Sequence, residues 1–366
     1  MKATAAIVWE GGDDFQLEEV ELEAPRADEV LVRVVASGMC HTDVAIKNQD
    51  VNFPVPLILG HEGSGIVEAV GKAISHVKPG DHVVMSGSSC GECHHCHNGL
   101  PSYCDEFIER NLLGARMDGT SPVSQKGEPV PAMFNGQSSF STKTVAAGRS
   151  VIKIDNDLPL ELMGPLGCGL ITGVGTVMNG LKPPSGSTIA IFGVGTVGLA
   201  ALIGARLMGC SKIIVIDPKP ARLEMAMEMG ATHAVNPANA DAVEEVKSIT
   251  GRGADFSVEC SGAPAAVRAA VDCLARPGWA AQVGATPGGI ELPFSMDNIG
   301  LGRGIKGVVL GDAPPQTFVP YLAELWRTDR LPYDRFVEYY DFADINQAAH
   351  DSAITGDVIK PILRME

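Results

Sequence analysis

Basic residues are scarce in this sequence of 366 residues, which has 28 Lys and Arg against 44 Asp and Glu and a net charge of −16. A surplus of negative charge repels phosphate backbones, so we expect no nucleic-acid partner. Aromatic residues make up only 5%, yet hydrophobic residues reach 45%, which is typical of a folded globular chain. At roughly 150 residues per domain, the length predicts about two domains.

Long hydrophobic runs free of glycine are also absent. Residues 162–181 and 187–205 carry no formal charge, but glycines interrupt both, so buried helices and a strand explain them better than membrane spans. The apolar N-terminal stretch meets Glu10 and is too short for a signal sequence. We therefore expect a cytoplasmic protein with no membrane segment, in which nine cysteines indicate metal binding or catalysis before disulfides.

The distribution of short apolar runs predicts an α/β organisation. Residues 1–165 are β-rich with irregular loops, whereas in residues 166–310 strands alternate with helix-length segments, which is typical of a doubly wound parallel sheet. The six strands expected there are 188–192, 212–216, 233–235, 256–259, 279–283 and 306–310. Residues 311–366 leave this rhythm, with strands expected at 336–340 and 358–363, and we expect this segment to return to the first domain.

A glycine-rich motif follows the first of those six strands. Gly193, Gly195 and Gly198 form G-x-G-x-x-G, which also contains Val197, and the motif opens a helix whose N-terminus can bind a pyrophosphate. Asp217 ends the next strand, where a carboxylate accepts hydrogen bonds from ribose hydroxyls and repels a 2′-phosphate. The motif thus predicts NAD rather than NADP, against the alternative of a glycine-rich turn beside a surface aspartate.

Four cysteines form a compact motif between residues 87 and 105. Cys90, Cys93, Cys96 and Cys104 have the spacing C-x2-C-x2-C-x7-C, which suits a closed tetrahedral structural zinc site. An iron–sulfur cluster is a second possibility. The Cys-x-x-Cys-His sequence also matches a c-type haem attachment signature, but haem attachment requires export.

A second group of metal-ligand residue types is dispersed along the chain. Cys40 and His61 lie about twenty residues apart, and Cys168 lies far beyond them. Two cysteines and one histidine would leave the fourth tetrahedral position of a zinc ion open for water or substrate. Spacing alone does not join these residues, because a lone cysteine is usually a small buried side chain.

Taken together, these motifs resemble the zinc-dependent medium-chain alcohol dehydrogenases, with aryl- or benzyl-alcohol dehydrogenases as the closest branch. The resemblance covers essentially the whole chain, in the order 40–43, 60–62, 90–104, 164–169 and 193–198. It implies a GroES-like β-rich catalytic domain, a Rossmann coenzyme domain, two zinc ions per chain, bound NAD, and a homodimer or homotetramer. The implied reaction oxidises a primary alcohol, aromatic or allylic, to the aldehyde.

The resemblance also assigns roles to individual residues. Cys40, His61 and Cys168 match the catalytic zinc ligands, and Asp43 matches the carboxylate that orients the histidine. Glu62 matches an acidic residue behind the metal, and Thr42 matches the hydroxyl that hydrogen-bonds the alcohol. The matched coenzyme contacts outside the glycine motif and Asp217 are His41, Arg222, Val283 and Lys360.

Two departures from the family pattern concern the proton relay and the substrate pocket. Ala45 stands where many members carry the histidine that ends the relay, so the proton must leave by His41 or another route. Ser86 and the small residues after it leave room for a ring or a long chain, and Phe140 is expected to stack on the substrate. Rival interpretations are a polyol dehydrogenase, a zinc-free quinone or enone reductase, and a non-catalytic redox sensor that binds NAD and zinc.

Overall fold

The computed structural model describes residues 1–51, 53–286 and 288–365. These form two compact units, one made of Met1–Cys168 with Pro314–Glu366 and the other of Gly169–Ala313. The unit boundaries fall within a few residues of the sequence-based boundaries at 165 and 310.

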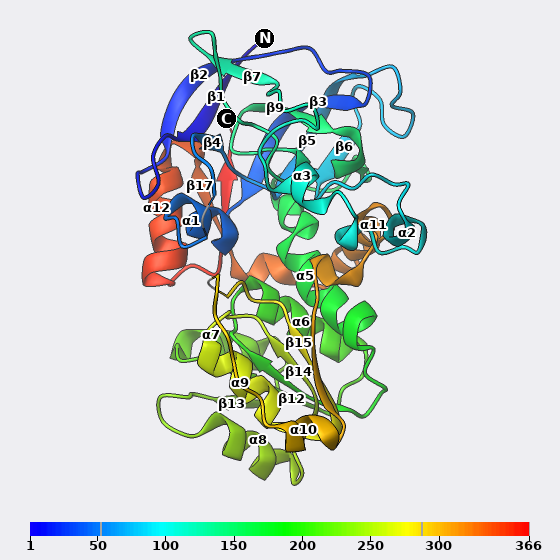
Figure 1. Ribbon diagram of the computed structural model, residues 1–366, viewed down its shortest axis with the longest axis vertical. Helices are drawn as coiled ribbons and strands as arrows, with labels where there is room; N and C mark the ends of the chain where they lie inside the picture. Colours follow the sequence, from blue (N-terminus) through cyan, green and yellow to red (C-terminus); the bar gives the residue numbers. More distant parts are fainter. Residues whose placement is uncertain (52, 287, 366) are drawn as a thin grey trace. The chain divides into compact units, whose positions relative to one another are not determined.

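The first unit is built on two sheets. The larger sheet has the order β10 (Val151–Lys153), β6 (His82–Met85), β5 (Gly63–Val70), β3 (Glu29–Gly38), β18 (Lys360–Arg364) and β17 (Val337–Asp341), and β9 (Lys143–Ala147) also pairs with β3. The smaller sheet has the order β4 (Leu57–Ile58), β1 (Lys2–Val8), β2 (Gln16–Leu22), β7 (Val123–Gln125) and β8 (Glu128–Pro129). Because β18 lies antiparallel to β3, the C-terminal strand belongs to the same sheet as β3, β5 and β6 (Figure 1).

Short helices connect the strands of the first unit. They are α1 (His41–Lys47), α2 (His94–His97), α3 (Phe107–Asn111), α4 (Leu160–Met163), α11 (Pro315–Arg327) and α12 (Ile345–Ala349). The longest is α11, whose C-terminal Arg327 forms ion pairs with Asp155 and Asp157.

The second unit is a six-stranded parallel sheet. Its order is β13 (His233–Val235), β12 (Lys212–Ile216), β11 (Thr188–Phe192), β14 (Ala254–Glu259), β15 (Leu274–Gln282) and β16 (Arg303–Gly307). The helices are α5 (Gly169–Gly175), α6 (Thr196–Leu207), α7 (Pro220–Glu228), α8 (Ala242–Thr250), α9 (Pro264–Asp272) and α10 (Met296–Gly300). This strand order is that of a doubly wound Rossmann sheet, and the predicted fold class is confirmed.

The last strand of this sheet differs from its sequence-based bounds. The prediction was 306–310, but β16 runs from Arg303 to Gly307. Leu310 and Gly311 have φ values of 48° and 68°, so the chain turns through left-handed backbone there and cannot continue as a strand.

Within the described residues, no single helix is long and apolar enough to span a membrane. Two consecutive helical segments, Leu160–Gly167 and Gly169–Leu181, together reach the length and hydrophobicity of a membrane span, but the chain bends between them. All seven residues of α5, which begins the second member of this pair, are buried in the protein.

Candidate active site

Helix α1 presents the first residues of the site. Cys40 precedes the helix, and its backbone N–H donates to Asp43 Oδ2 at 3.1 Å, which closes a capping box at the helix N-terminus. The other carboxylate oxygen of Asp43 accepts from Gly60 N at 3.0 Å and lies 2.9 Å from His61 Nδ1. The buried Asp43 therefore fixes the imidazole so that Nε2 is the nitrogen available to a metal.

The structure brings Cys40, His61 and Cys168 together, with their ligand atoms all within 4.8 Å of one another. Two sulfur atoms and one imidazole nitrogen suit zinc, and this group of three described residues leaves one tetrahedral position for another ligand. The sequence spacing gave no sign of this cluster, which only the family resemblance predicted.

The electrostatics of the cluster favour metal binding. The pKa of the Cys40 thiol lies well below its ordinary value, mainly because the Cys168 thiol hydrogen-bonds to it and also because of His61. That hydrogen bond and burial raise the pKa of Cys168 well above its ordinary value. Burial lowers the pKa of His61, but the charges of Asp43 and Cys40 outweigh this effect and raise it overall. A divalent cation that bound both sulfurs as thiolates would replace the proton that the two sulfurs share.

Glu62 lies behind the cluster in a buried ion pair with Lys360. The distance from Lys360 Nζ to Glu62 Oε2 is 2.7 Å, and the same ammonium donates to the Met39 carbonyl at 2.9 Å. Burial raises the pKa of Glu62, although Lys360 opposes the change. The resemblance places Lys360 near a pyrophosphate, whereas the structure shows it buried against this carboxylate, a contact that the sequence analysis missed.

The residues expected to move a proton begin α1. The Thr42 hydroxyl lies 3.7 Å from Cys40 Sγ, so it is beside a metal-ligand atom. His41 is exposed, whereas Ala45 is buried and carries no group that could transfer a proton.

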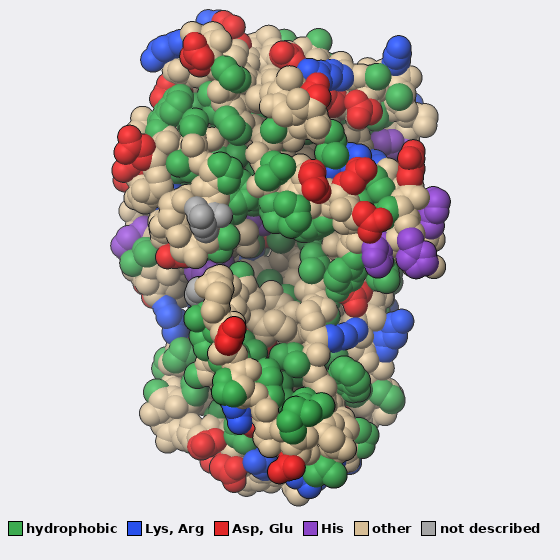
Figure 2. All heavy atoms as spheres, in the orientation of Figure 1, with side chains coloured by type: hydrophobic (Ala, Val, Ile, Leu, Met, Phe, Trp, Pro, Cys, Tyr) green, Lys and Arg blue, Asp and Glu red, His purple; other side chains and the backbone are tan. Residues whose placement is uncertain are grey.

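The four-cysteine lobe forms a second cluster. The sulfurs of Cys90, Cys93, Cys96 and Cys104 all lie within 4.8 Å of one another. Backbone N–H groups donate to two of them, with Cys93 N 3.3 Å from Cys90 Sγ and Cys90 N 3.2 Å from Cys104 Sγ. Backbone hydrogen bonds lower the pKa of Cys93 to about 6, while burial raises the pKa of Cys104 to about 12. The donor set fits a closed structural zinc site. Figure 2 shows histidine side chains gathered on the surface over α2, outside this cluster.

The glycine motif connects β11 to α6. Gly193 has a φ of 83°, which favours glycine, and a Cβ on Gly198 would lie 2.0 Å from the Gly193 carbonyl oxygen. A Cβ on Gly195 would meet nothing within 4 Å, so this face of the loop is open to a ligand. These are the three glycine roles of a dinucleotide-binding loop: the tight turn, close backbone approach, and close packing of the helix.

Asp217 follows β12 and supports the same loop. Its carboxylate accepts from Val194 N and from Lys219 N, both at 2.8 Å. Arg222 on α7 approaches it, with Nη1 3.9 Å from Asp217 Oδ2. The Asp217 carboxylate therefore lies at the strand end where the adenosine ribose is expected.

Val283, the other residue expected to contact the coenzyme, follows β15 and donates its backbone N–H to Glu259 O.

The two residues expected to line the substrate pocket, Ser86 and Phe140, are both buried. Phe140 is fully buried and packs edge-to-face against Phe15 at 5.7 Å in the core, so its predicted role of stacking on the substrate is not supported. The ring next to the metal-binding imidazole is that of Phe134, 5.3 Å from His61, which the sequence analysis missed, and it is fully buried as well. Ser86 is also buried and donates to the Gly167 carbonyl at 2.6 Å, so it holds the backbone just before Cys168.

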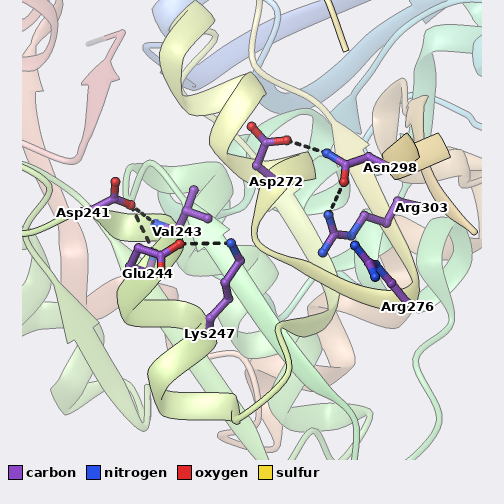
Figure 3. A pocket seen from close by; sticks show the side chains of 8 residues that line it. All are labelled: Asp241, Val243, Glu244, Lys247, Asp272, Arg276, Asn298 and Arg303. Atoms are coloured by element: carbon purple, nitrogen blue, oxygen red, sulfur yellow. Dashed lines mark hydrogen bonds and ion pairs between the residues drawn. The ribbon is translucent and has the colours of Figure 1, made fainter. Parts of the chain in front are cut away.

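A separate open cavity of about 540 Å³ lies in the second unit (Figure 3). It is lined by Asp241, Val243, Glu244, Lys247, Asp272, Arg276, Asn298 and Arg303. Its three acidic and three basic side chains balance in charge, and Asn298 bridges Asp272 and Arg303. None of the predicted site residues lines this cavity, and we assign it no part in the chemistry.

The Rossmann sheet, the dinucleotide loop and the two zinc-type clusters define a zinc-binding dehydrogenase. The family model "Alcohol dehydrogenase GroES-like domain" matches residues 26–156, and the model "Zinc-binding dehydrogenase" matches residues 196–327. The chain therefore belongs to the zinc-dependent alcohol dehydrogenase family.

Full-length relatives agree with this assignment. Geraniol dehydrogenase of Castellaniella defragrans is 42% identical over 99% of this chain and 98% of its own. The crystal structure of benzyl alcohol dehydrogenase from Acinetobacter calcoaceticus is 41% identical and covers both chains completely, with a TM-score of 0.97. A zinc-binding alcohol dehydrogenase domain protein from Burkholderia ambifaria is 43% identical, with the same TM-score, and covers 100% of this chain and 99% of its own.

Proposed function

We propose that this alcohol dehydrogenase uses NAD to oxidise primary aromatic or allylic alcohols to aldehydes. The observation that carries the proposal is the cluster of Cys40, His61 and Cys168, whose three ligand atoms leave a coordination position for a substrate hydroxyl. The names of two full-length relatives, a geraniol and a benzyl alcohol dehydrogenase, support the substrate class. The carboxylate of Asp217 supports NAD over NADP, because it would repel a 2′-phosphate.

Zinc at this cluster would supply the Lewis acidity that lowers the pKa of a bound hydroxyl, and NAD would supply the hydride acceptor. The protein side chains perform the rest. Asp43 holds the His61 ring by its Nδ1, and the Thr42 hydroxyl accepts the proton released by the alcohol. Ala45 offers no further relay, and we assign the transfer to solvent to His41, which is adjacent to Thr42 and exposed, whereas its other neighbour Asp43 is buried.

The proposal is tested by metal analysis and a steady-state assay of the purified protein. We expect about two zinc ions per chain and alcohol-dependent formation of NADH at 340 nm. The specificity constant kcat/KM should be higher for benzyl, cinnamyl and terpene alcohols than for straight-chain alcohols. Cys168→Ser should abolish turnover while NADH binding is retained. Equal use of NADP, or preference for straight-chain alcohols, would contradict the corresponding part of the proposal.

The buried rings give a further test of the metal site. Phe134 and Phe140 are both fully buried, but only Phe134 is described in edge-to-face contact with the His61 imidazole. Phe134→Leu should therefore lower kcat by loosening the His61 ring, whereas the matched control Phe140→Leu, whose ring packs against Phe15, should alter stability more than kcat. A loss of kcat confined to Phe140→Leu would contradict this assignment.

We also propose that the protein forms a homodimer or homotetramer through β16. This strand ends the described sheet, and large hydrophobic side chains nearby are exposed, among them Trp279, Met296 and Leu301. An edge strand beside exposed apolar side chains favours pairing with a second copy. Light scattering should show a dimer or a tetramer. Ile305→Pro, a substitution within β16, should shift the measured mass toward that of the monomer.

A further inference from the structure

The backbone that carries His61 is held by one buried amide side chain. Gln137 donates from Nε2 to the His61 carbonyl at 3.0 Å, and its Oε1 accepts from Gly63 N at 3.1 Å. These two contacts lie on either side of Glu62, and Gln137 is fully buried. A single side chain therefore fixes the chain both at a metal-binding residue and just after its acidic neighbour.

The surroundings of Gln137 hold this amide in place. The loop of residues 134–139 runs along residues 58–63, with Ser138 Oγ donating to Ile58 O at 2.6 Å and Ser139 N donating to Gly60 O at 2.8 Å. Asn135 and Ser138 have positive φ values of 49° and 50°. Non-glycine residues persist in that conformation when neighbouring contacts determine it, and they cluster at functional sites.

Asp43 and Gln137 restrain different parts of the same residue. Asp43 orients the imidazole ring through Nδ1, but it does not fix the carbonyl side of the residue. The position of Nε2 relative to Cys40 and Cys168 depends on both the ring and the backbone. Small displacements of a metal ligand lower affinity and activity, and loss of an orienting partner typically costs about 10–100-fold.

We propose that Gln137 is a positioning residue of the catalytic zinc site, acting through the backbone of His61. The inference rests on the proposed function, since it takes Cys40, His61 and Cys168 as zinc ligands. The two hydrogen bonds of the Gln137 amide both go to backbone atoms, so its action on the site passes through the backbone and not through a ligand side chain.

The chain offers a matched control for this amide. Asn346 makes the same pair of bonds to another backbone, with Oδ1 accepting from Phe15 N at 2.9 Å and Nδ2 donating to Phe15 O at 3.0 Å. Phe15 is not a metal ligand and packs in the hydrophobic core. Removing either amide deletes two hydrogen bonds to backbone groups, buried for Gln137 and partly buried for Asn346, but of the two amides only Gln137 contacts the backbone of His61.

The experiment compares Gln137→Met with Asn346→Leu in the intact zinc-loaded protein. The thermal midpoint should fall in both variants. Only Gln137→Met should accelerate removal of the catalytic zinc by a chelator, by about 10–100-fold, and change the visible spectrum of cobalt substituted at that site. It should also lower kcat more than it raises KM for the alcohol.

Equal rates of zinc loss and unchanged cobalt spectra in the two variants would show that Gln137 is only structural and overturn the inference. If Gln137→Met does not fold, Gln137→Asn makes the comparison, because its shorter amide cannot reach both backbone groups and should still lose zinc faster than Asn346→Leu. A wild-type protein that binds zinc only in the four-cysteine lobe would instead overturn the proposed function.

Discussion

The ion pair between Glu62 and Lys360 gives the strongest prediction about stability. Glu62 is fully buried, and the Lys360 side chain is 2% exposed, with 2.7 Å between Nζ and Oε2. Lys360→Met keeps much of the side-chain volume but removes the positive charge beside the buried carboxylate. Removing one member of a buried ion pair costs about 3–5 kcal/mol of unfolding free energy.

That cost can be converted into a thermal shift. Domains of 150–250 residues shift by about 2–4 °C per kcal/mol, so Lys360→Met should lower the unfolding midpoint by roughly 6–20 °C. Differential scanning calorimetry of the zinc-loaded protein measures this shift. The double variant Glu62→Gln with Lys360→Met should recover most of the loss, because replacing both members of a buried pair is often close to neutral.

A second ion pair in the same unit provides the control. Lys143 and Glu68 are also 2.7 Å apart, but their side chains are about one third exposed at 31% and 30%. Lys143→Met should change the unfolding free energy by at most about 1 kcal/mol, because water and salt screen an exposed pair. If Lys143→Met and Lys360→Met lowered the midpoint equally, burial would not be what makes the Lys360 contact important, and the reasoning would fail.

Three further outcomes test the site. Asp43→Asn should lower the affinity of the catalytic zinc by about 10–100-fold, measured by chelator competition, because the imidazole loses its charged partner; unchanged affinity would contradict the orienting role. Cys104→Ser should reduce the zinc content from about two to about one ion per chain and lower the midpoint of thermal unfolding, while the remaining zinc supports turnover. If the variant kept two zinc ions, the four-cysteine lobe would not be a metal site. Asp217→Ala should weaken NADH binding and lower the ratio of the NADPH dissociation constant to the NADH dissociation constant, both measured by fluorescence titration. If that ratio did not change, this carboxylate would not select between the two coenzymes.

Local motifs were the part of the site that the sequence could predict. The three roles of Gly193, Gly195 and Gly198 depend on backbone conformation within six consecutive residues, so the pattern of residues already contains them. The four cysteines of the lobe lie within fifteen residues and for the same reason predict one cluster. Most strands of the parallel sheet were also predicted, because each is a short apolar run between turn residues.

Contacts decided by side-chain direction could not be predicted. Phe134 and Phe140 lie in one loop, and their residue types give no reason to prefer one as the neighbour of His61. Left-handed conformations at Asn135, Gly136 and Ser138 turn the chain between the two rings. The Asn-Gly pair signals a turn at this point, but it does not indicate which of the two rings will face His61.

The pairing of Glu62 with Lys360 shows how a distant segment becomes part of a site. The two residues are separated by 298 positions, and no motif joins them. What joins them is the register of β18 against β3, in which Ile362 faces Gly38 and Met39 N donates to Pro361 O at 2.9 Å. Because successive residues of a strand point to opposite faces, a slip of one residue would direct the Lys360 side chain away from Glu62. The core residues that fix this register, such as Leu363, therefore also determine the charge placed behind the zinc ligands.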